Sequence, residues 1–127
     1  MSTLKTGTVQ NNTGTGAPLF KNNAGTEIGQ LAKAWVNFDG TGTLAVSDDF
    51  NVSSVTDNGT GNYTVNFTTN MSNANYAVAV SSYMTGSNSY AAYERLDSFT
   101  TSSFLIRTVH SSSFQDISLV CAAVFGA

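Results

Sequence analysis

Residues 34–67 read AWVNFDGTGTLAVSDDFNVSSVTDNGTGNYTVNF, and in this stretch apolar and polar residues alternate around two glycine-rich turn sequences, DGTGT and TDNGTGN. A period of two residues is the pattern of a strand that buries one face. Asp-Gly and Asn-Gly supply the positive φ that tight hairpin turns require. The stretch therefore predicts antiparallel β-structure, and we expect Trp35 to lie in its core.

The composition extends this prediction to the whole chain. Ser, Thr, Asn and Gly make up 57 of the 127 residues, whereas charged residues are only 10%. Helix surfaces are normally covered by Glu, Lys, Arg and Gln, so the solvent faces here must be Thr, Ser and Asn on strands and loops. We expect an all-β fold, an antiparallel β-sandwich of about seven to eight strands. It would span residues 31–127 as one domain, preceded by an extended N-terminal arm at residues 1–30.

The last predicted strand differs from the others. Apolar-rich segments predict four further strands, at residues 76–84, 91–96, 103–110 and 117–125. Both faces of the final one are apolar, and such a strand must be buried on both sides. In a monomer it could run through the middle of the core, and in an oligomer its second face could meet symmetry mates. We favour a homotrimer with Val120, Ala122 and Val124 at the subunit interface, since small residues suit close approach at an axis.

The arm cannot close a core of its own. It is rich in Thr, Asn and Gly, and its apolar residues are isolated. The remaining surface could come from its own domain, a neighbouring subunit or another protein. We therefore expect attachment contacts at Leu4, Val9, Leu19 and Phe20.

Two motifs carry a resemblance to a known group of proteins. KAWVNFDGTGT at residues 33–43 and FNVSSVTDNGTGNYTVNFT at residues 50–68, with the opening MSTLK and Val9-Gln10, resemble small virion proteins of tailed bacteriophages, especially marine and cyanobacterial ones. These proteins look tail-fibre-like, and the resemblance weakens beyond about residue 76.

The resemblance implies a non-enzymatic virion structural protein, a surface appendage of tail-fibre or spike type that contributes to host-surface attachment. It would be made in the cytoplasm of the host bacterium and carried on the virion surface, on the tail or the capsid. Tail-fibre-like proteins are usually trimeric, so its partners would be its own copies and other virion proteins gripped by the arm. Two alternatives stay open: a capsid decoration protein on the head, and a carbohydrate-binding adhesin module.

Aromatic residues around a Gly-Ser-Asn loop are the candidate contacts for a host glycan or receptor. Tyrosine rings can stack on sugar faces, and short polar side chains can bond their hydroxyls. The candidates are Tyr83, Asn88, Ser89, Tyr90 and Tyr93. In the alternative interpretation, Tyr83 and Tyr93 are half-buried strand residues with their hydroxyls at the rim.

No catalytic, cofactor-binding or metal-ligating set can be defended from the sequence. His110 is the only histidine and has no second ligand at metal-binding spacing. Asp39, Asp48 and Asp57 sit beside turn residues, so we expect them to shape turns rather than to form a glycosidase pair. The loop at Asp57 is the best calcium candidate, but it contains a single carboxylate.

Net charge and hydropathy exclude some classes of partner. The net charge is −3 and the five Lys and Arg residues are scattered, so no cationic stripe is available for nucleic acid. No stretch approaches the roughly 20 apolar residues that cross a bilayer, and no signal peptide is evident. The lone cysteine, Cys121, lies in an apolar run and is expected to be a buried reduced thiol.

Overall fold

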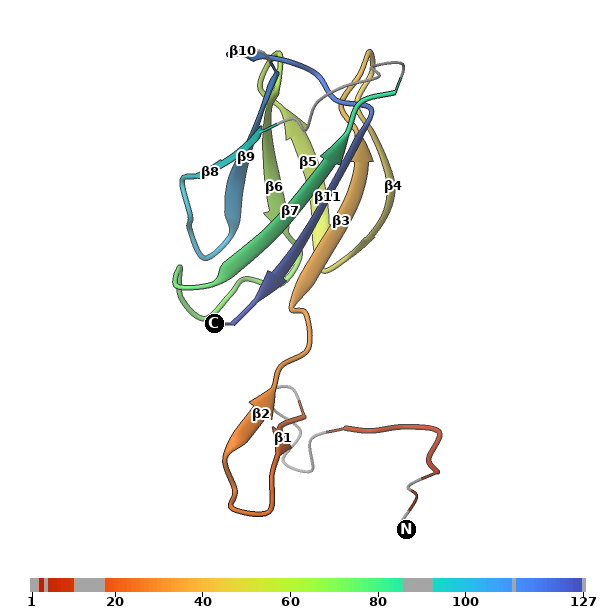
Figure 1. The fold of residues 1–127 in the computed structure, drawn as a ribbon, viewed down its shortest axis with the longest axis vertical. Helices are drawn as coiled ribbons and strands as arrows, with labels where there is room; N and C mark the ends of the chain where they lie inside the picture. The colour runs from red at the N-terminus through yellow and green to blue at the C-terminus, as the bar shows by residue number, and fades with distance from the viewer. Residues whose placement is uncertain (1–2, 4, 11–17, 86–92, 111, 127) are drawn as a thin grey trace. The chain divides into compact units, whose positions relative to one another are not determined.

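The computed structural model describes residues 3, 5–10, 18–85, 93–110 and 112–126. The chain divides into two compact units, residues 1–31 and 32–127. All regular structure in the described residues is strand, and every strand pairing is antiparallel, which confirms the predicted all-β class (Figure 1).

The first unit contains one small hairpin, β1 (Phe20–Lys21) and β2 (Glu27–Gly29). Asn22 closes its turn, because Oδ1 accepts hydrogen bonds from the backbone N–H groups of Ala24 and Thr26, each at 3.0 Å. The large apolar side chains described in this unit are all exposed: Val9, Leu19, Phe20, Ile28 and Leu31. Leu4 lies outside the described residues.

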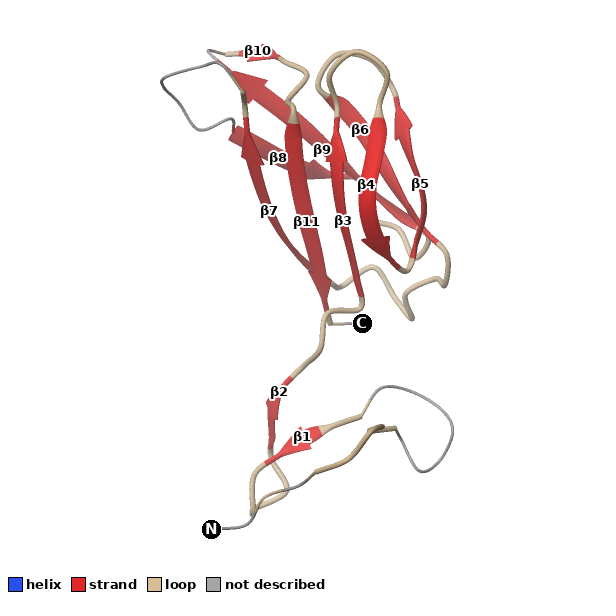
Figure 2. Cartoon of the chain, turned by 90° about the vertical axis from the view of Figure 1, so that its right-hand side faces the viewer, coloured by secondary structure: helices blue, strands red, loops and turns tan. Residues whose placement is uncertain are grey.

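The second unit consists of two sheets. The first has the order β4-β3-β11-β7 and the second contains β10, β9, β6 and β5, with β8 also paired to β9. The first sheet comprises β4 (Ala45–Phe50), β3 (Ala34–Asp39), β11 (Leu119–Phe125) and β7 (Ala77–Tyr83). The second comprises β10 (Ser113–Phe114), β9 (Ser103–His110), β8 (Tyr93–Asp97), β6 (Asn62–Phe67) and β5 (Val52–Asp57). Figure 2 shows the first sheet in front of the second, a sandwich-like arrangement.

Alternate residues of both sheets fill one core. Phe38 of β3 meets Tyr63 of β6 edge to face, with ring centroids 5.1 Å apart. Phe67 packs against Tyr76 and Phe104 at 5.6 and 5.7 Å. Tyr63, Phe38 and Phe104 are among the largest fully buried side chains. Since these rings come from facing sheets, the predicted period of two residues does set the buried faces of β3, β6 and β9.

The strand β4 lies in the stretch 34–67 that was predicted to be β-structure, but the sequence did not set its bounds. Residues 32–127 contain nine strands in their described part, against the expected seven to eight. All six residues of β4 are exposed, including Asp48 and Asp49, so no alternation marks it. Its pairing with β3 holds it in place, and the register shifts between Asn37 and Phe38.

The predicted subunit interface on β11 is wrong. This strand lies between β3 and β7, and Val120, Ala122 and Val124 are only 0%, 4% and 1% exposed. They are buried in the core of a single chain, so they have no surface left for a symmetry mate. The other face of β11, which includes Cys121 and Ala123, points outward.

The predicted burial of Trp35 and of Cys121 is also wrong. Trp35 lies between Ala34 and Val36, which both point into the core, so the pleat turns the indole outward and leaves it 37% exposed. Cys121 is a free, half-buried thiol on the same outer face.

Two of the three aspartates expected in turns behave as predicted, whereas the expectation is wrong for Asp48, which lies in the exposed strand β4. Asp39 accepts hydrogen bonds from the N–H and Oγ1 of Thr41, and Asp57 accepts one from Gly59 N. These contacts confirm that both carboxylates shape turns.

Asn51 forms the corner between β4 and β5, where the chain passes from one sheet to the other. Its φ is +54°, and its side chain donates to the carbonyls of Lys33 and Thr69 and accepts from Thr69 N.

Candidate functional site

The outer side of the first sheet is an apolar surface. Cross-strand partners point to the same face, so the register identifies its members. Ala123 lies between Trp35 and Ala79, and Leu119 lies opposite Tyr83. We call this surface the apolar face. Its small residues are Ala77, Ala79, Ser81, Cys121 and Ala123, and its large residues are Trp35, Phe50, Tyr83, Leu119 and Phe125. The same register places the polar Asn37 and the charged Asp48 on this side, toward the β4 edge.

A shallow groove runs along the middle of the apolar face. Its volume is about 480 Å³, and its walls include Trp35, Asn37, Ala79, Ser81, Cys121 and Ala123. The groove exists because small side chains on β7 and β11 lie beside a large indole on β3. Neither β7 nor β11 contains a charged residue.

The outer side of the second sheet is polar, in contrast. Asn66 Nδ2 donates to Ser54 Oγ and Thr56 Oγ1, each at 3.1 Å. Asn58 Nδ2 donates to Thr64 Oγ1 at 2.8 Å. One chain, rich in Ser, Thr and Asn, therefore covers one sheet with bonded polar groups and leaves the other apolar.

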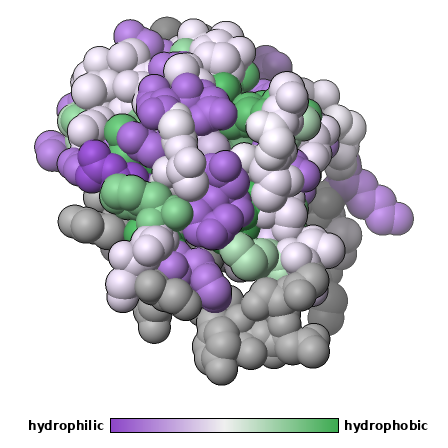
Figure 3. Space-filling model, turned by 90° about the horizontal axis from the view of Figure 1, so that it is seen from above, coloured by the Kyte–Doolittle hydropathy of each residue, from purple (hydrophilic) through white to green (hydrophobic). Residues whose placement is uncertain are grey.

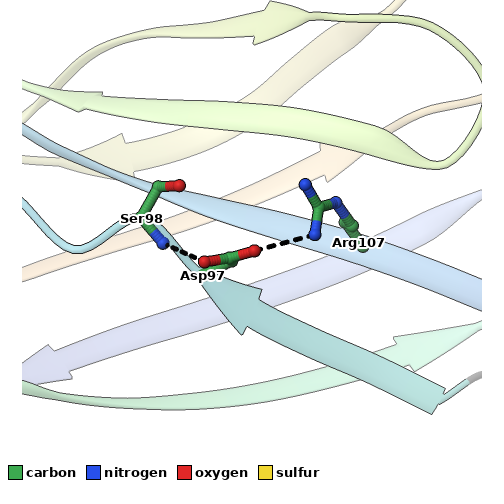
Figure 4. A network of polar contacts seen from close by, with 3 residues as sticks. All are labelled: Asp97, Ser98 and Arg107. Atoms are coloured by element: carbon green, nitrogen blue, oxygen red, sulfur yellow. Dashed lines mark hydrogen bonds and ion pairs between the residues drawn. The ribbon is translucent and has the colours of Figure 1, made fainter.

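An ion pair belongs to this polar side (Figure 4). Arg107 Nη1 lies 2.8 Å from Asp97 Oδ2, and the other carboxylate oxygen accepts a hydrogen bond from Ser98 N at 2.7 Å. Both side chains are substantially exposed, so water and salt screen the pair and it contributes little to stability.

The predicted glycan contacts are only partly described. Tyr83, at the end of β7, is 60% exposed rather than half-buried. Tyr93 begins β8, and Asn88, Ser89 and Tyr90 lie outside the described residues. The structure therefore gives one member of the predicted cluster as an accessible ring, and the cluster itself stays a prediction.

The end of β7 is fixed by the chain segment before β11. Ser118 Oγ donates to the Tyr83 carbonyl at 3.1 Å and accepts from Thr85 N at 2.8 Å.

Viewed from above, this end of the molecule is a mixture of hydrophilic, neutral and small hydrophobic areas (Figure 3).

A buried polar cluster joins distant parts of the chain. The Tyr63 hydroxyl and Gly61 N both donate to Asp116 Oδ1 at 2.7 Å. Burial, followed by the hydrogen bond and negative charge of Asp116, raises the pKa of Tyr63 above its ordinary value. Tyr63 is fully buried, so this cluster ties β6 to the segment before β11 and has no access to a substrate. The sequence offers no signal for it, because the partners are 53 residues apart.

The described residues offer neither a metal-ligating cluster nor a membrane-spanning helix. Among the residues that the structure describes, no three His, Cys, Asp or Glu side chains come together to hold a metal ion. His110 ends β9 and is half-buried. The described part of the chain has no helix long and apolar enough to span a membrane.

Comparison of the chain with protein-family models, with curated proteins and with solved structures gives no match.

Proposed function

We propose that this chain is a non-enzymatic structural protein of a tailed-bacteriophage virion, a surface appendage of tail-fibre or spike type that contributes to attachment to the host. The motifs at residues 33–43 and 50–68 support the proposal through their resemblance to virion proteins. The protein would be made in the cytoplasm of the infected bacterium and carried on the virion surface. The second unit would be a displayed β-sandwich, assembled as a homotrimer.

One structural observation carries the attachment role. Every large apolar side chain described in the first unit is exposed, from Val9 to Leu31. Exposed apolar side chains on a small unit mark a surface that another protein covers. The first unit is therefore the part that grips other virion proteins, which leaves the second unit free for display.

The location on the particle tests the proposal. Intact virions are labelled with gold-conjugated antibody raised against residues 32–127 and imaged by electron microscopy. Label on tail appendages supports the proposed appendage. Label over the whole head would support a capsid decoration protein instead, and absence of label with antibody that recognises the denatured virion band would contradict a surface location.

A carbohydrate-binding adhesin module is the second candidate, and the exposed ring of Tyr83 favours it. Tyr83→Ala would then reduce retention on host envelope polysaccharide by about two- to tenfold, since one stacked ring contributes about 0.5–1.5 kcal/mol. Phe114→Ala is the matched control, because Phe114 is a similarly exposed ring on β10. Equal retention by both variants and the unaltered chain would remove this candidate.

A further inference from the structure

We propose that copies of this chain associate through the apolar face of the sheet β4-β3-β11-β7. The inference rests on the proposed homotrimer and names the surface that builds it. The interface residues of β11 are then not the core-facing ones predicted from the sequence but the outward ones, Leu119, Cys121, Ala123 and Phe125.

The area of the face approaches that of a subunit interface. The four aromatic residues Trp35, Phe50, Tyr83 and Phe125 are 37%, 54%, 60% and 37% exposed. With about 200 Å² for each fully exposed ring, they leave roughly 400 Å² open to water. A stable interface buries about 800 Å² per partner, so these rings alone would supply about half of it. Leu119 and the small residues between the rings add further apolar area.

The shape of the face fits another copy of itself. The groove of small residues on β7 and β11 is bordered on the β3 side by the Trp35 indole, and Leu119 and Tyr83 are the next outward residues along β11 and β7. A groove and a bulky border on one surface allow the border of one copy to enter the groove of the next, and this head-to-tail contact closes into a trimer when it repeats around a threefold axis. Ala79 and Ala123 at the bottom of the groove permit close approach of the sheets.

The charge distribution agrees with association of like surfaces. Two copies of a charged face repel each other, and burial of an unpaired charge is costly. Since β7 and β11 carry no charged residue, the groove itself can be buried without that cost, whereas Asp48 on the edge strand β4 would have to stay at the rim of the interface, open to water. The polar side of the second sheet, with the exposed pair Asp97 and Arg107, would keep facing solvent.

The test compares matched arginine substitutions in the full chain. Ala79 and Thr56 are both exposed, and each lies on an edge strand, β7 and β5 respectively. Ala79→Arg places a charge in the groove, whereas Thr56→Arg places one on the polar side. Mass is measured by light scattering from about 1 to 100 μM, with circular dichroism to verify folding. Ser81→Arg, also in the groove, serves as a second variant if Ala79→Arg does not fold.

The unaltered chain and Thr56→Arg are expected at three times the chain mass of 13.3 kDa, and Ala79→Arg at the monomer mass. A folded Ala79→Arg that keeps the oligomer would overturn the assignment. A monomeric unaltered chain at 100 μM would also overturn it. Neither result changes the immunogold outcome, so failure of this inference is distinguishable from failure of the proposed place on the virion surface, although a monomer would also remove the proposed homotrimer.

Discussion

Two glycines with the same backbone conformation should respond very differently to alanine. Gly42 and Gly61 have φ values of +62° and +61°, and they lie in the two turn sequences DGTGT and TDNGTGN. A Cβ at Gly42 would have nothing within 4 Å. A Cβ at Gly61 would lie 2.5 Å from the Thr108 carbonyl oxygen and 2.7 Å from Gln115 N.

The expected magnitudes follow from this difference. An alanine in the left-handed region costs about 1–2 kcal/mol, and this cost applies equally at both positions. At Gly61 the overlap with two backbone atoms forces the chain to shift, which adds about 1–3 kcal/mol. The shift also disturbs the hydrogen bond from Gly61 N to Asp116. We therefore expect Gly42→Ala to lose about 1–2 kcal/mol of unfolding free energy and Gly61→Ala about 2–5 kcal/mol, a difference of about 1–3 kcal/mol.

The assay is urea denaturation followed by circular dichroism. All variants are compared at one protein concentration, because the stability of an oligomer depends on concentration. Gly42→Ala is the control for backbone strain, so the difference between the two variants isolates the steric overlap. If the two free energies agree within about 0.5 kcal/mol, the close packing of Gly61 against β9 is not a determinant of stability.

Three further predictions concern polar groups. Asp116→Ala leaves buried Gly61 N without its acceptor and leaves the Tyr63 hydroxyl only its longer bond, 3.3 Å to the Gly40 carbonyl, so it should cost about 2–3 kcal/mol. Asp48→Ala, on an exposed strand, should cost under about 0.5 kcal/mol in the same denaturation assay, and equal losses would contradict this. Because the pKa of Tyr63 is raised in the folded state, the stability that Tyr63 contributes is fully present below about pH 10 and falls as the pH rises above it. Tyr63→Phe should weaken this fall in the urea midpoints between about pH 9 and 11. An unchanged slope would show that Tyr63 does not cause the fall. Asn51→Ala removes the side-chain hydrogen bonds of the β4–β5 corner and puts an alanine at a positive φ, so it should lower the unfolding free energy by about 2–3 kcal/mol. Asn51→Gly should lower it less, because glycine adopts this φ without strain. Thermal melts that rank the two variants in the opposite order would contradict this.

The local features of the fold could be predicted from the sequence. The turn roles of Asp39 and Asp57 follow from residues two positions apart, so short-range chemistry is sufficient to define them. The alternation in Tyr63, Val65 and Phe67 likewise identifies the buried face of β6.

Features that depend on distant partners could not be predicted. The strand β4 has no alternation and is held by its register with β3. The sequence shows that both faces of β11 are apolar but not which one meets the core, since that depends on the pairing with β3 and β7. Trp35 was misplaced for the same reason, because a shift of one residue exchanges the faces of a strand.

The candidate site was predictable only in outline. Apolar residues in the last strand indicated an interface, but the outer surface also needs residues of β3, β4 and β7 that lie 35 to 90 positions away along the chain. The accessible ring of Tyr83 agrees with the predicted glycan cluster, although Asn88, Ser89 and Tyr90 lie outside the described residues.

Association through the apolar face is the claim on which the proposed assembly depends, and chemical cross-linking at Cys121 tests it most directly. Cys121 is the only cysteine and lies in the groove. Sheets that pack face to face are about 10 Å apart, so a bismaleimide with a spacer of about that length should join two copies. We predict a covalent dimer on a reducing denaturing gel at micromolar protein, and none with Cys121→Ser. A Cys121 thiol that reacts with a monofunctional maleimide yet gives only monomer with the bismaleimide would contradict the account.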